Sequence, residues 1–160
     1  MQDPIVIRQE RPDQPEVVAL LSLLDHYLAS LYPPEANHIM DVPALLAPEV
    51  AFFVAREGNQ VVGTGALRRQ PGEAETAGQP YGEIKRLFVH PARRGARIGA
   101  RLLATLEDTL RREACGLALL ETGREQTAAV RLYQRRGYAE RGPFGGYPDN
   151  GLSVFFGKAL

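Results

Sequence analysis

The sequence predicts one α/β (α+β mixed) domain over residues 1–160, built on a mixed, mostly antiparallel sheet with helices on both faces. Strand-like and helix-like segments follow one another in the order β-α-α-β-β-β-α-β-α-β-β. The central part of the chain alternates strand, helix, strand and helix, and antiparallel hairpins flank it on both sides. This order predicts helices on two faces of one sheet. The length of 160 residues is that of a single domain with its own hydrophobic core.

The elements of the first third of the chain follow from local chemistry. Residues 5–8 form a short β-branched run, as expected of a strand. Apolar side chains recur at helical spacing over 17–31, which predicts a helix of about four turns. Residues 13–16 before them supply a residue type that favours the N-cap position, a proline and an acid, as is typical of a helix start. That helix ends at Tyr32, because a residue before a proline avoids the helical region. A short helix is expected over 41–46.

A hairpin and a third strand follow. Apolar runs at 52–55 and 61–67 flank a Gly58-Asn59 turn, a pattern typical of a β-hairpin. We expect a loop at 70–80, where prolines and glycines interrupt small and acidic residues. The next strand, 81–89, becomes wholly apolar toward its end.

The last elements alternate helix and strand. A helix begins near Ile98, with a buried leucine stripe and two exposed i,i+4 pairs, Glu107 with Arg111 and Asp108 with Arg112. The fully apolar run after Gly116 predicts a strand buried on both faces. The remaining predicted elements are a strand over 117–120, a helix over 127–136 ended by a C′ glycine at 137, and strands over 138–141 and 152–156.

Composition excludes several classes of protein. The 19 Lys+Arg balance 19 Asp+Glu, so the chain is not a polycation that coats nucleic acid. Cys115 is the only cysteine, which excludes an internal disulfide. Its place between a helix and a buried strand predicts a small core residue. The three histidines lack ligand spacing, so no metal is expected. No run approaches the ~20 apolar residues of a membrane span, and the start lacks a basic, apolar leader. We expect a cytoplasmic protein without nucleic-acid or membrane partners.

One stretch combines an apolar strand, an arginine- and glycine-rich loop and a helix start: Leu87-Phe88-Val89-His90-Pro91-Ala92-Arg93-Arg94-Gly95-Ala96-Arg97-Ile98-Gly99-Ala100. The first N–H groups of a helix have no intrahelical acceptor, and the helix dipole adds partial positive charge there. This combination suits a phosphate or pyrophosphate. Neither the Walker loop nor the dinucleotide Gly-x-Gly-x-x-Gly pattern is present.

The stretch resembles the Arg/Gln-x-x-Gly-x-Gly/Ala signature of the GNAT N-acetyltransferase superfamily, with Arg94 in the first position and Gly99 in the last. Arg97 stands where that family prefers its first glycine, so we expect a negative φ at Arg97. Residues 82–89 resemble the family's central strand. Residues 126–133 resemble its Asn-x-x-Ala-x-x-Leu-Tyr element, with Gln126 replacing the asparagine, and Gly137-Tyr138 follows as in the family. The resemblance covers about half of the chain, from 81 to 138, and implies the GNAT fold.

The resemblance also implies acetyl-CoA as the acetyl donor. Backbone amides of the loop would hold its pyrophosphate and the preceding strand end its pantetheine arm, and such a strand end cannot be fully paired to its neighbour. The residues implied in donor binding are Leu87, Phe88, Val89, Arg94, Gly95, Ala96, Arg97, Ile98, Gly99, Ala100, Gln126 and Tyr133.

The catalytic residues implied by the resemblance are Glu83 and Tyr133. An alkylamine with a pKa near 10.4 is almost all ammonium at pH 7, so a proton acceptor is needed, and Glu83 matches the family's general base. Glu121 is a second candidate. Tyr133 matches the tyrosine that donates to the departing thiolate. A structural interpretation stands beside each role: Glu83 paired with Lys85 or Arg86, and Tyr133 packing its ring.

The expected reaction is acetyl transfer from acetyl-CoA to a primary amine, by an N-acetyltransferase that acts on a small molecule, peptide or protein. Candidates to line the acceptor pocket are Tyr32, Glu35, His38, Glu121 and Tyr147. The alternative is a non-catalytic acyl-CoA-binding regulatory module of the same fold. The sequence leaves open the acceptor, an acyl group longer than acetyl, and whether the chain forms a homodimer. Nucleic-acid binding through the loop arginines is disfavoured by the neutral charge and the lack of interleaved aromatics.

Overall fold

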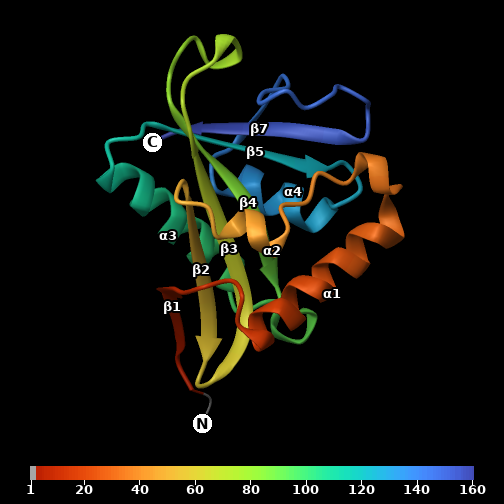
Figure 1. Ribbon diagram of the computed structural model, residues 1–160, viewed down its shortest axis with the longest axis vertical. Helices are drawn as coiled ribbons and strands as arrows, with labels where there is room; N and C mark the ends of the chain where they lie inside the picture. The colour runs from red at the N-terminus through yellow and green to blue at the C-terminus, as the bar shows by residue number, and fades with distance from the viewer. Residues whose placement is uncertain (1–2) are drawn as a thin grey trace. The chain divides into compact units, whose positions relative to one another are not determined.

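The computed structural model describes residues 3–160 (Figure 1). Its strands and helices are β1 (Ile5–Gln9), α1 (Pro15–Leu31), η1 (Pro34–Ala36), α2 (Val42–Leu45), β2 (Val50–Glu57), β3 (Gln60–Gln70), η2 (Ala74–Thr76), β4 (Tyr81–Val89), η3 (Pro91–Arg93), α3 (Ile98–Arg112), β5 (Leu117–Gly123), α4 (Thr127–Arg135), β6 (Ala139–Arg141) and β7 (Ser153–Ala159). This order confirms the predicted succession, and β7 extends three residues beyond the expected Phe156.

The sheet has seven strands in the order β1-β2-β3-β4-β5-β7-β6. Strands β1 and β2, β5 and β7, and β6 and β7 pair antiparallel, whereas β4 and β5 pair in parallel through Gly82, Glu83 and Ile84. A mixed, mostly antiparallel sheet was expected and is confirmed. Figure 1 shows β5 and β7 side by side.

The chain forms two compact units. Unit 1 comprises Met1–Leu67 and Lys85–Leu106, and unit 2 comprises Arg68–Ile84 and Glu107–Leu160. Strands β3 and β4 and helix α3 each run from one unit into the other along the chain.

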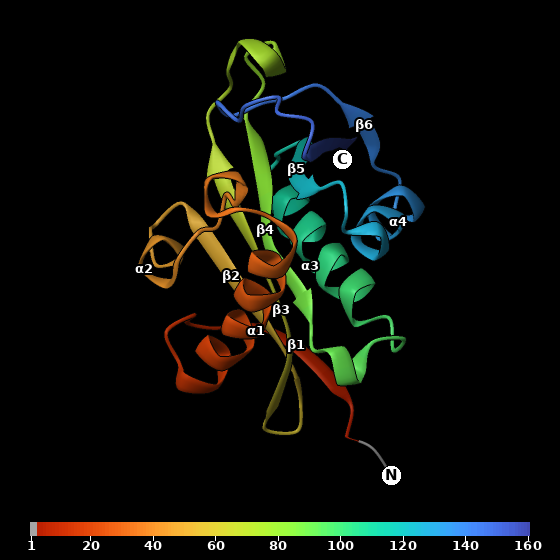
Figure 2. The ribbon, with the colours of Figure 1, turned by 90° about the vertical axis from the view of Figure 1, so that its right-hand side faces the viewer.

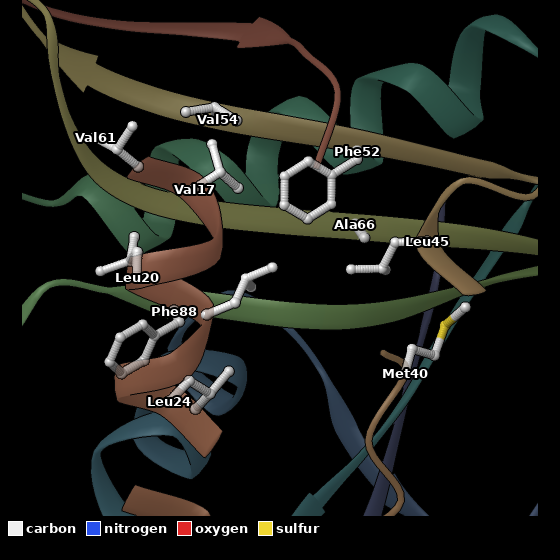
Figure 3. Close-up of a cluster of buried hydrophobic side chains, with 11 residues drawn as sticks. Val17, Leu20, Leu24, Met40, Leu45, Phe52, Val54, Val61, Ala66 and Phe88 are labelled. Atoms are coloured by element: carbon white, nitrogen blue, oxygen red, sulfur yellow. The ribbon is translucent and has the colours of Figure 1, made fainter. Parts of the chain in front are cut away.

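The core of unit 1 lies between α1 and the β2–β3 hairpin (Figure 3). Val17, Leu20 and Leu24 recur on one side of α1, and their side chains point toward the strands. On the strands, Val54 and Ala66 have no exposed surface. The amphipathic spacing of the sequence therefore positions α1 on this face of the sheet.

Helix α3 packs against the other face of β3. A side chain at Gly63 would meet Leu102 and Ile98 of α3, and one at Gly65 would meet Leu106. Neighbouring strand residues point to opposite faces, so these glycines face away from Ala66. Within unit 1, helices thus cover two faces, as the sequence predicted, and glycine lets α3 come close to β3.

Helix starts in unit 1 differ in how they are capped. Asp41 caps α2, since its Oδ1 accepts a hydrogen bond from Ala44 N at 2.9 Å. For α1 the expectation of an acidic cap at the start is wrong. Gln14 is its N-cap residue and makes no side-chain capping bond, whereas Asp13 pairs with Arg11 at 2.8 Å.

Strand β4 contains a residue in an unusual backbone conformation. Arg86 has a φ of 53°, in the left-handed region that side chains rarely adopt. Thr64 Oγ1 on β3 donates to the Arg86 carbonyl at 2.8 Å, and the Arg86 side chain is buried. The hydrogen bond from the neighbouring strand helps hold this conformation.

Unit 2 contains a buried charged group on α3. Glu107 accepts hydrogen bonds from Tyr138 Oη at 2.9 Å and from Lys158 Nζ at 3.1 Å. Glu107 and Arg111 form the expected i,i+4 pair, at 3.9 Å. The expectation that Glu107 is exposed is wrong, because it is only 6% exposed. Asp108, expected to pair with Arg112, is 3.0 Å from Arg111. Local helical spacing did not reveal that Lys158, 51 residues away, would reach Glu107.

The end of α4 matches its prediction. Arg136 is the C-cap residue and Gly137 has a φ of 91°, as expected of a C′ glycine. Figure 2 shows α4 leading into β6 within unit 2.

Candidate active site

A short loop, the α3 start loop (residues 90–97), joins β4 to α3 in unit 1. Its first part is the turn η3, where His90 Nδ1 accepts a hydrogen bond from Ala92 N at 3.1 Å. Gly95 has a φ of 94°, and a Cβ there would meet no atom within 4 Å. The glycine is therefore required by the backbone conformation and not by lack of space.

The expectation of a negative φ at Arg97 is wrong. Its φ is 60°, in the left-handed region. The chain adopts here the conformation that glycine takes easily, although the residue has a Cβ. Arg97 O then accepts the hydrogen bond from Arg101 N at 3.0 Å that opens α3. The geometry of this turn into the helix, and not the preference of the side chain, fixes the conformation.

The start of α3 presents unpaired donors. Because the first i to i−4 bond runs from Arg101 to Arg97, the N–H groups of Ile98, Gly99 and Ala100 come before it and point out of the helix end. Ile98 is 1% exposed, and its packing fixes the helix start. Three amides and the helix dipole together favour an anion at this point.

The arginines of the loop divide into two kinds. Arg93 pairs with Glu57 at 2.6 Å, and Arg101 donates to the Ile5 carbonyl at 3.0 Å. Arg94 lies over the Phe88 ring at 5.7 Å and, like Arg97, is exposed. Across residues 3–160, neither Arg94 nor Arg97 has an ion-pair partner. These two guanidinium groups are available to a negatively charged ligand.

Unit 2 contains what we term the Glu83 cluster: Glu83, Arg68 and Tyr147. Glu83 is only 1% exposed, and its Oε1 accepts a hydrogen bond from Arg68 Nη2 at 2.9 Å. Its Oε2 accepts one from the Tyr147 hydroxyl. Of the two suggested partners, Arg86 is bound to Asp25 and the Met40 carbonyl. Lys85, the other suggested partner, donates to the His38 carbonyl at 3.0 Å.

Tyr147 belongs to an aromatic cluster. Its ring lies 5.5 Å from Phe144 and 6.1 Å from Phe155. Burial, followed by the negative charge of Glu83, raises the pKa of the Tyr147 phenol well above its ordinary value. Tyr147 is therefore a neutral hydrogen-bond donor around pH 7. The structure joins it to Glu83, 64 residues away in sequence.

The loop that carries Tyr147 is tied to the β3–β4 loop by Glu73. Glu73 Oε1 accepts from Gly145 N at 2.6 Å, and its Oε2 accepts from the Tyr81 hydroxyl at 3.0 Å. The turn η2 holds Glu73 through a capping box with Thr76. The region expected to be an irregular loop is thus organised around one carboxylate. Neither this role of Glu73 nor that of Arg68 could be predicted from the sequence, because their partners are distant in sequence.

Tyr133 is buried in unit 2. It is 6% exposed, and its ring lies 5.9 Å from Tyr138 and 6.3 Å from Phe156. Burial, and then the charge of Glu121, raises the pKa of Tyr133. Glu121 itself accepts a hydrogen bond from Ser153 Oγ at 2.6 Å. Tyr133 is therefore protonated around pH 7, as a hydrogen-bond donor must be.

The remaining predicted site residues are described within their own units. In unit 1, Tyr32 is the buried C-cap residue of α1, Glu35 is exposed in η1, and His38 is partly buried. In unit 2, Gln126 is the N-cap residue of α4 and makes no side-chain capping bond. At the end of β4, Phe88 belongs to the unit 1 core, whereas Leu87 and Val89 are partly exposed.

Two further properties bear on function. Among residues 3–160, no group of three or more His, Cys, Asp or Glu side chains is arranged to hold a metal ion. None of the helices in the described part of the chain has the length and apolar character needed to cross a membrane.

Comparison with known proteins identifies the family. The model of the acetyltransferase (GNAT) family matches residues 17–138. The chain belongs to this family. The match includes most of α1, the α3 start loop, Glu83 and Tyr133, so the resemblance seen in the sequence is confirmed.

Relatives of this GNAT chain are acetyltransferases by name. An "IAA acetyltransferase" of Azospirillum brasilense is 45% identical over 98% of both chains. A solved structure from Klebsiella pneumoniae, assigned as an acyl-CoA N-acyltransferase, is 34% identical, covers 98% of this chain and 97% of its own, and has a TM-score of 0.79. A GNAT acetyltransferase of Elizabethkingia anophelis with acetyl-CoA bound has a TM-score of 0.64 at 19% identity over 99% of both chains, a likeness of fold.

Proposed function

We propose that the protein is an acetyl-CoA-dependent N-acetyltransferase that acetylates a primary amine. The α3 start loop carries this proposal. With the three amides of the first turn of α3, the exposed guanidinium groups of Arg94 and Arg97 on this loop offer donors and positive charge to a pyrophosphate. Membership in the GNAT family and a fold relative with bound acetyl-CoA support the choice of ligand.

Most of the proposed donor contacts lie on the end of β4, the α3 start loop and the first turn of α3. Amides of Ile98, Gly99 and Ala100, with the turn at Gly95 before them, would hold the pyrophosphate, and Arg94 and Arg97 would pair with its charges. The remaining proposed donor contacts are Leu87, Phe88, Val89, Ala96, Gln126 and Tyr133. Acetyl-CoA supplies the acetyl group as a thioester; the protein binds and orients it.

Glu83 is the proposed general base. At neutral pH the acceptor is an ammonium ion and must lose a proton before its nitrogen can attack the thioester carbonyl. The Glu83 carboxylate is buried, and the Arg68 guanidinium stabilises its charge. Glu121, hydrogen-bonded to Ser153, is the alternative base.

Tyr133 is the proposed acid. Its buried hydroxyl keeps its proton around pH 7, because burial raises its pKa. When the carbon–sulfur bond breaks, the electron pair goes to sulfur, and Tyr133 donates a hydrogen bond or a proton to the thiolate. Since a thiol has a pKa near 8.5 and this phenol a higher one, hydrogen bonding requires less free energy than full proton transfer.

The proposal is tested by thiol release from acetyl-CoA with a panel of amines. The panel includes simple alkylamines and an aminoalkylphosphonate, the kind of acceptor named for one relative. IAA, named for another relative, has no primary amine and is assayed beside these amines. Glu83→Gln and Tyr133→Phe should each lower kcat by about 100-fold, the usual scale of general acid–base catalysis. Exposed Tyr27→Phe is the matched control and should keep the parent rate.

Three outcomes decide the proposal. If both variants match the parent on an accepted amine, the assigned roles are wrong, and Glu121→Gln then tests the alternative base. If acetyl-CoA raises the Tm but no amine gives thiol release, the protein is an acyl-CoA-binding module instead. If Arg94→Ala and Arg97→Ala leave the acetyl-CoA affinity unchanged, the loop is not the donor site.

A further inference from the structure

The Glu83 carboxylate is poorly accessible for a group that must take a proton from a substrate. Its side chain is 1% exposed, Arg68 donates to one oxygen and the Tyr147 hydroxyl donates to the other. Tyr147 is only partly buried. A proton coming from outside the Glu83 cluster therefore reaches Tyr147 more easily than it reaches the carboxylate.

We propose that Tyr147 is a catalytic residue that relays the proton from the acceptor ammonium to Glu83. This inference rests on the proposed function. As an N–H bond of the ammonium breaks, its electron pair stays on nitrogen and the proton bonds to the Tyr147 oxygen. In the same step the original hydroxyl proton of Tyr147 passes to Glu83 Oε2. Ammonium and carboxylate become amine and carboxylic acid, and Tyr147 is unchanged.

The surroundings of Tyr147 favour this concerted form. The charges that bear on its hydroxyl are Glu83 on β4, Glu121 on β5 and Arg68 on β3. Burial and the two carboxylates outweigh the guanidinium and raise the pKa of the phenol. A free phenolate is thus disfavoured, and the incoming proton must arrive as the outgoing one leaves. Ring contacts with Phe144 and Phe155 hold the hydroxyl in line with Glu83.

A second tyrosine–glutamate pair in unit 2 serves as a control that distinguishes a proton relay from a purely structural hydrogen bond. The Tyr81 hydroxyl also donates to a glutamate, Glu73, and Tyr81 also packs on Phe144. Tyr81 is 1% exposed, so no substrate reaches its hydroxyl. If the Tyr147 bond only holds the fold, then Tyr147→Phe and Tyr81→Phe should affect activity alike.

The experiment compares the parent, Tyr147→Phe, Tyr81→Phe and Glu83→Gln in thiol release with butylamine and 2-phenylethylamine from pH 7 to pH 10. At pH 7, Tyr147→Phe should lower kcat/KM for the amine by about 10- to 100-fold, at or below the usual range for proton transfer. KM for acetyl-CoA should stay constant. The deficit should shrink toward pH 10, because free amine with a pKa near 10.4 then needs no relay. Tyr81→Phe should stay within about twofold of the parent at every pH.

Non-additivity gives a second measurement. A relay and its final acceptor act as one unit, so the double variant Glu83→Gln/Tyr147→Phe should be no slower than Glu83→Gln alone. If Tyr147→Phe does not fold, the proton inventory of the parent protein replaces it. The rate is plotted against the deuterium fraction in H₂O–D₂O mixtures. A curved plot, which indicates two protons moving together, supports the relay, and a linear plot overturns it.

The outcomes separate the relay from the function on which it rests. Three results would overturn the relay alone, provided that Glu83→Gln is still impaired. They are a parent rate for Tyr147→Phe, an equal loss of activity for Tyr81→Phe, and a Tyr147→Phe deficit in kcat/KM that does not change with pH. No thiol release by the parent with any amine of the panel, or a fully active Glu83→Gln, would overturn the proposed function and the relay together.

Discussion

Arg86 on β4 is bound to Asp25 on α1: its Nη1 lies 2.5 Å from Asp25 Oδ1, and its Nε donates to the Met40 carbonyl at 2.9 Å. The Arg86 side chain is 5% exposed and that of Asp25 42%. One guanidinium group thus joins a strand, a helix and the segment before α2, all in unit 1. It uses the forked donors that only arginine has.

Replacing this arginine by lysine should therefore not be conservative. We expect Arg86→Lys to lower the free energy of unfolding by about 1–3 kcal/mol, because one ammonium cannot serve both acceptors in the same geometry. Urea unfolding monitored by circular dichroism measures the change. Arg111→Lys, at an exposed ion pair with Asp108, is the control and should change stability by less than about 0.5 kcal/mol. Equal effects at the two sites would contradict this explanation.

The positive φ of Arg97 predicts a difference between two small replacements. Arg97→Ala and Arg97→Gly both remove the charge, but only glycine adopts a φ of 60° without steric cost. We expect the glycine variant to be more stable than the alanine variant by about 1 kcal/mol. The two thermal unfolding curves measure this difference directly. A more stable alanine variant would mean that the left-handed conformation is not strained.

Tyr138 should make the protein sensitive to alkali. Burial, and next Glu107, raises the pKa of its phenol above the unfolded value of 10.0. The folded state then binds this proton more tightly, so the stabilisation is complete below pH 10 and is lost as pH rises above it. The expected slope is up to about 1.4 kcal/mol per pH unit for this group. Urea unfolding between pH 9 and 11 should show a shallower fall in Tyr138→Phe, whereas exposed Tyr27→Phe should keep the parent slope.

Local patterns predicted the elements because each depends on residues close in sequence. Helical spacing gave α1, and the Gly58-Asn59 turn gave the β2–β3 hairpin. The start of α3 at Ile98 was also placed correctly, although the sign of φ at Arg97 was not. Backbone conformation at that residue depends on the turn into α3, which side-chain preference alone does not reveal.

The partners of the proposed site residues could not be predicted in the same way. Tyr147 was a candidate for the acceptor pocket, but its bond to Glu83 spans 64 residues. Arg68 gave no signal at all, because a single arginine near the end of a strand is common. These contacts depend on how strands and loops of unit 2 pack together, which spacing in the sequence does not encode.

The buried carboxylate of Glu107 and its partly buried partner Lys158 allow a test of packing in unit 2. Their side chains are 7% and 22% exposed, and Lys158 also lies 5.6 Å from the centre of the Tyr138 ring. We expect Lys158→Met to lower the free energy of unfolding by about 2–4 kcal/mol, because it leaves a buried carboxylate without its cation. A double-mutant cycle with Glu107→Gln should give a coupling energy above about 1.5 kcal/mol.

The control is an exposed pair in the same unit. Arg69 and Glu113 are also in contact, at 2.5 Å, but their side chains are 39% and 36% exposed. The corresponding cycle, Arg69→Met with Glu113→Gln, should give about 0–1 kcal/mol, since solvent screens the interaction. Both cycles are measured by urea unfolding at pH 7 after coincidence of two spectroscopic probes has established two-state behaviour. If the two cycles give equal coupling energies, burial adds nothing to the Glu107–Lys158 interaction. The pair then contributes no more to stability than an exposed ion pair does.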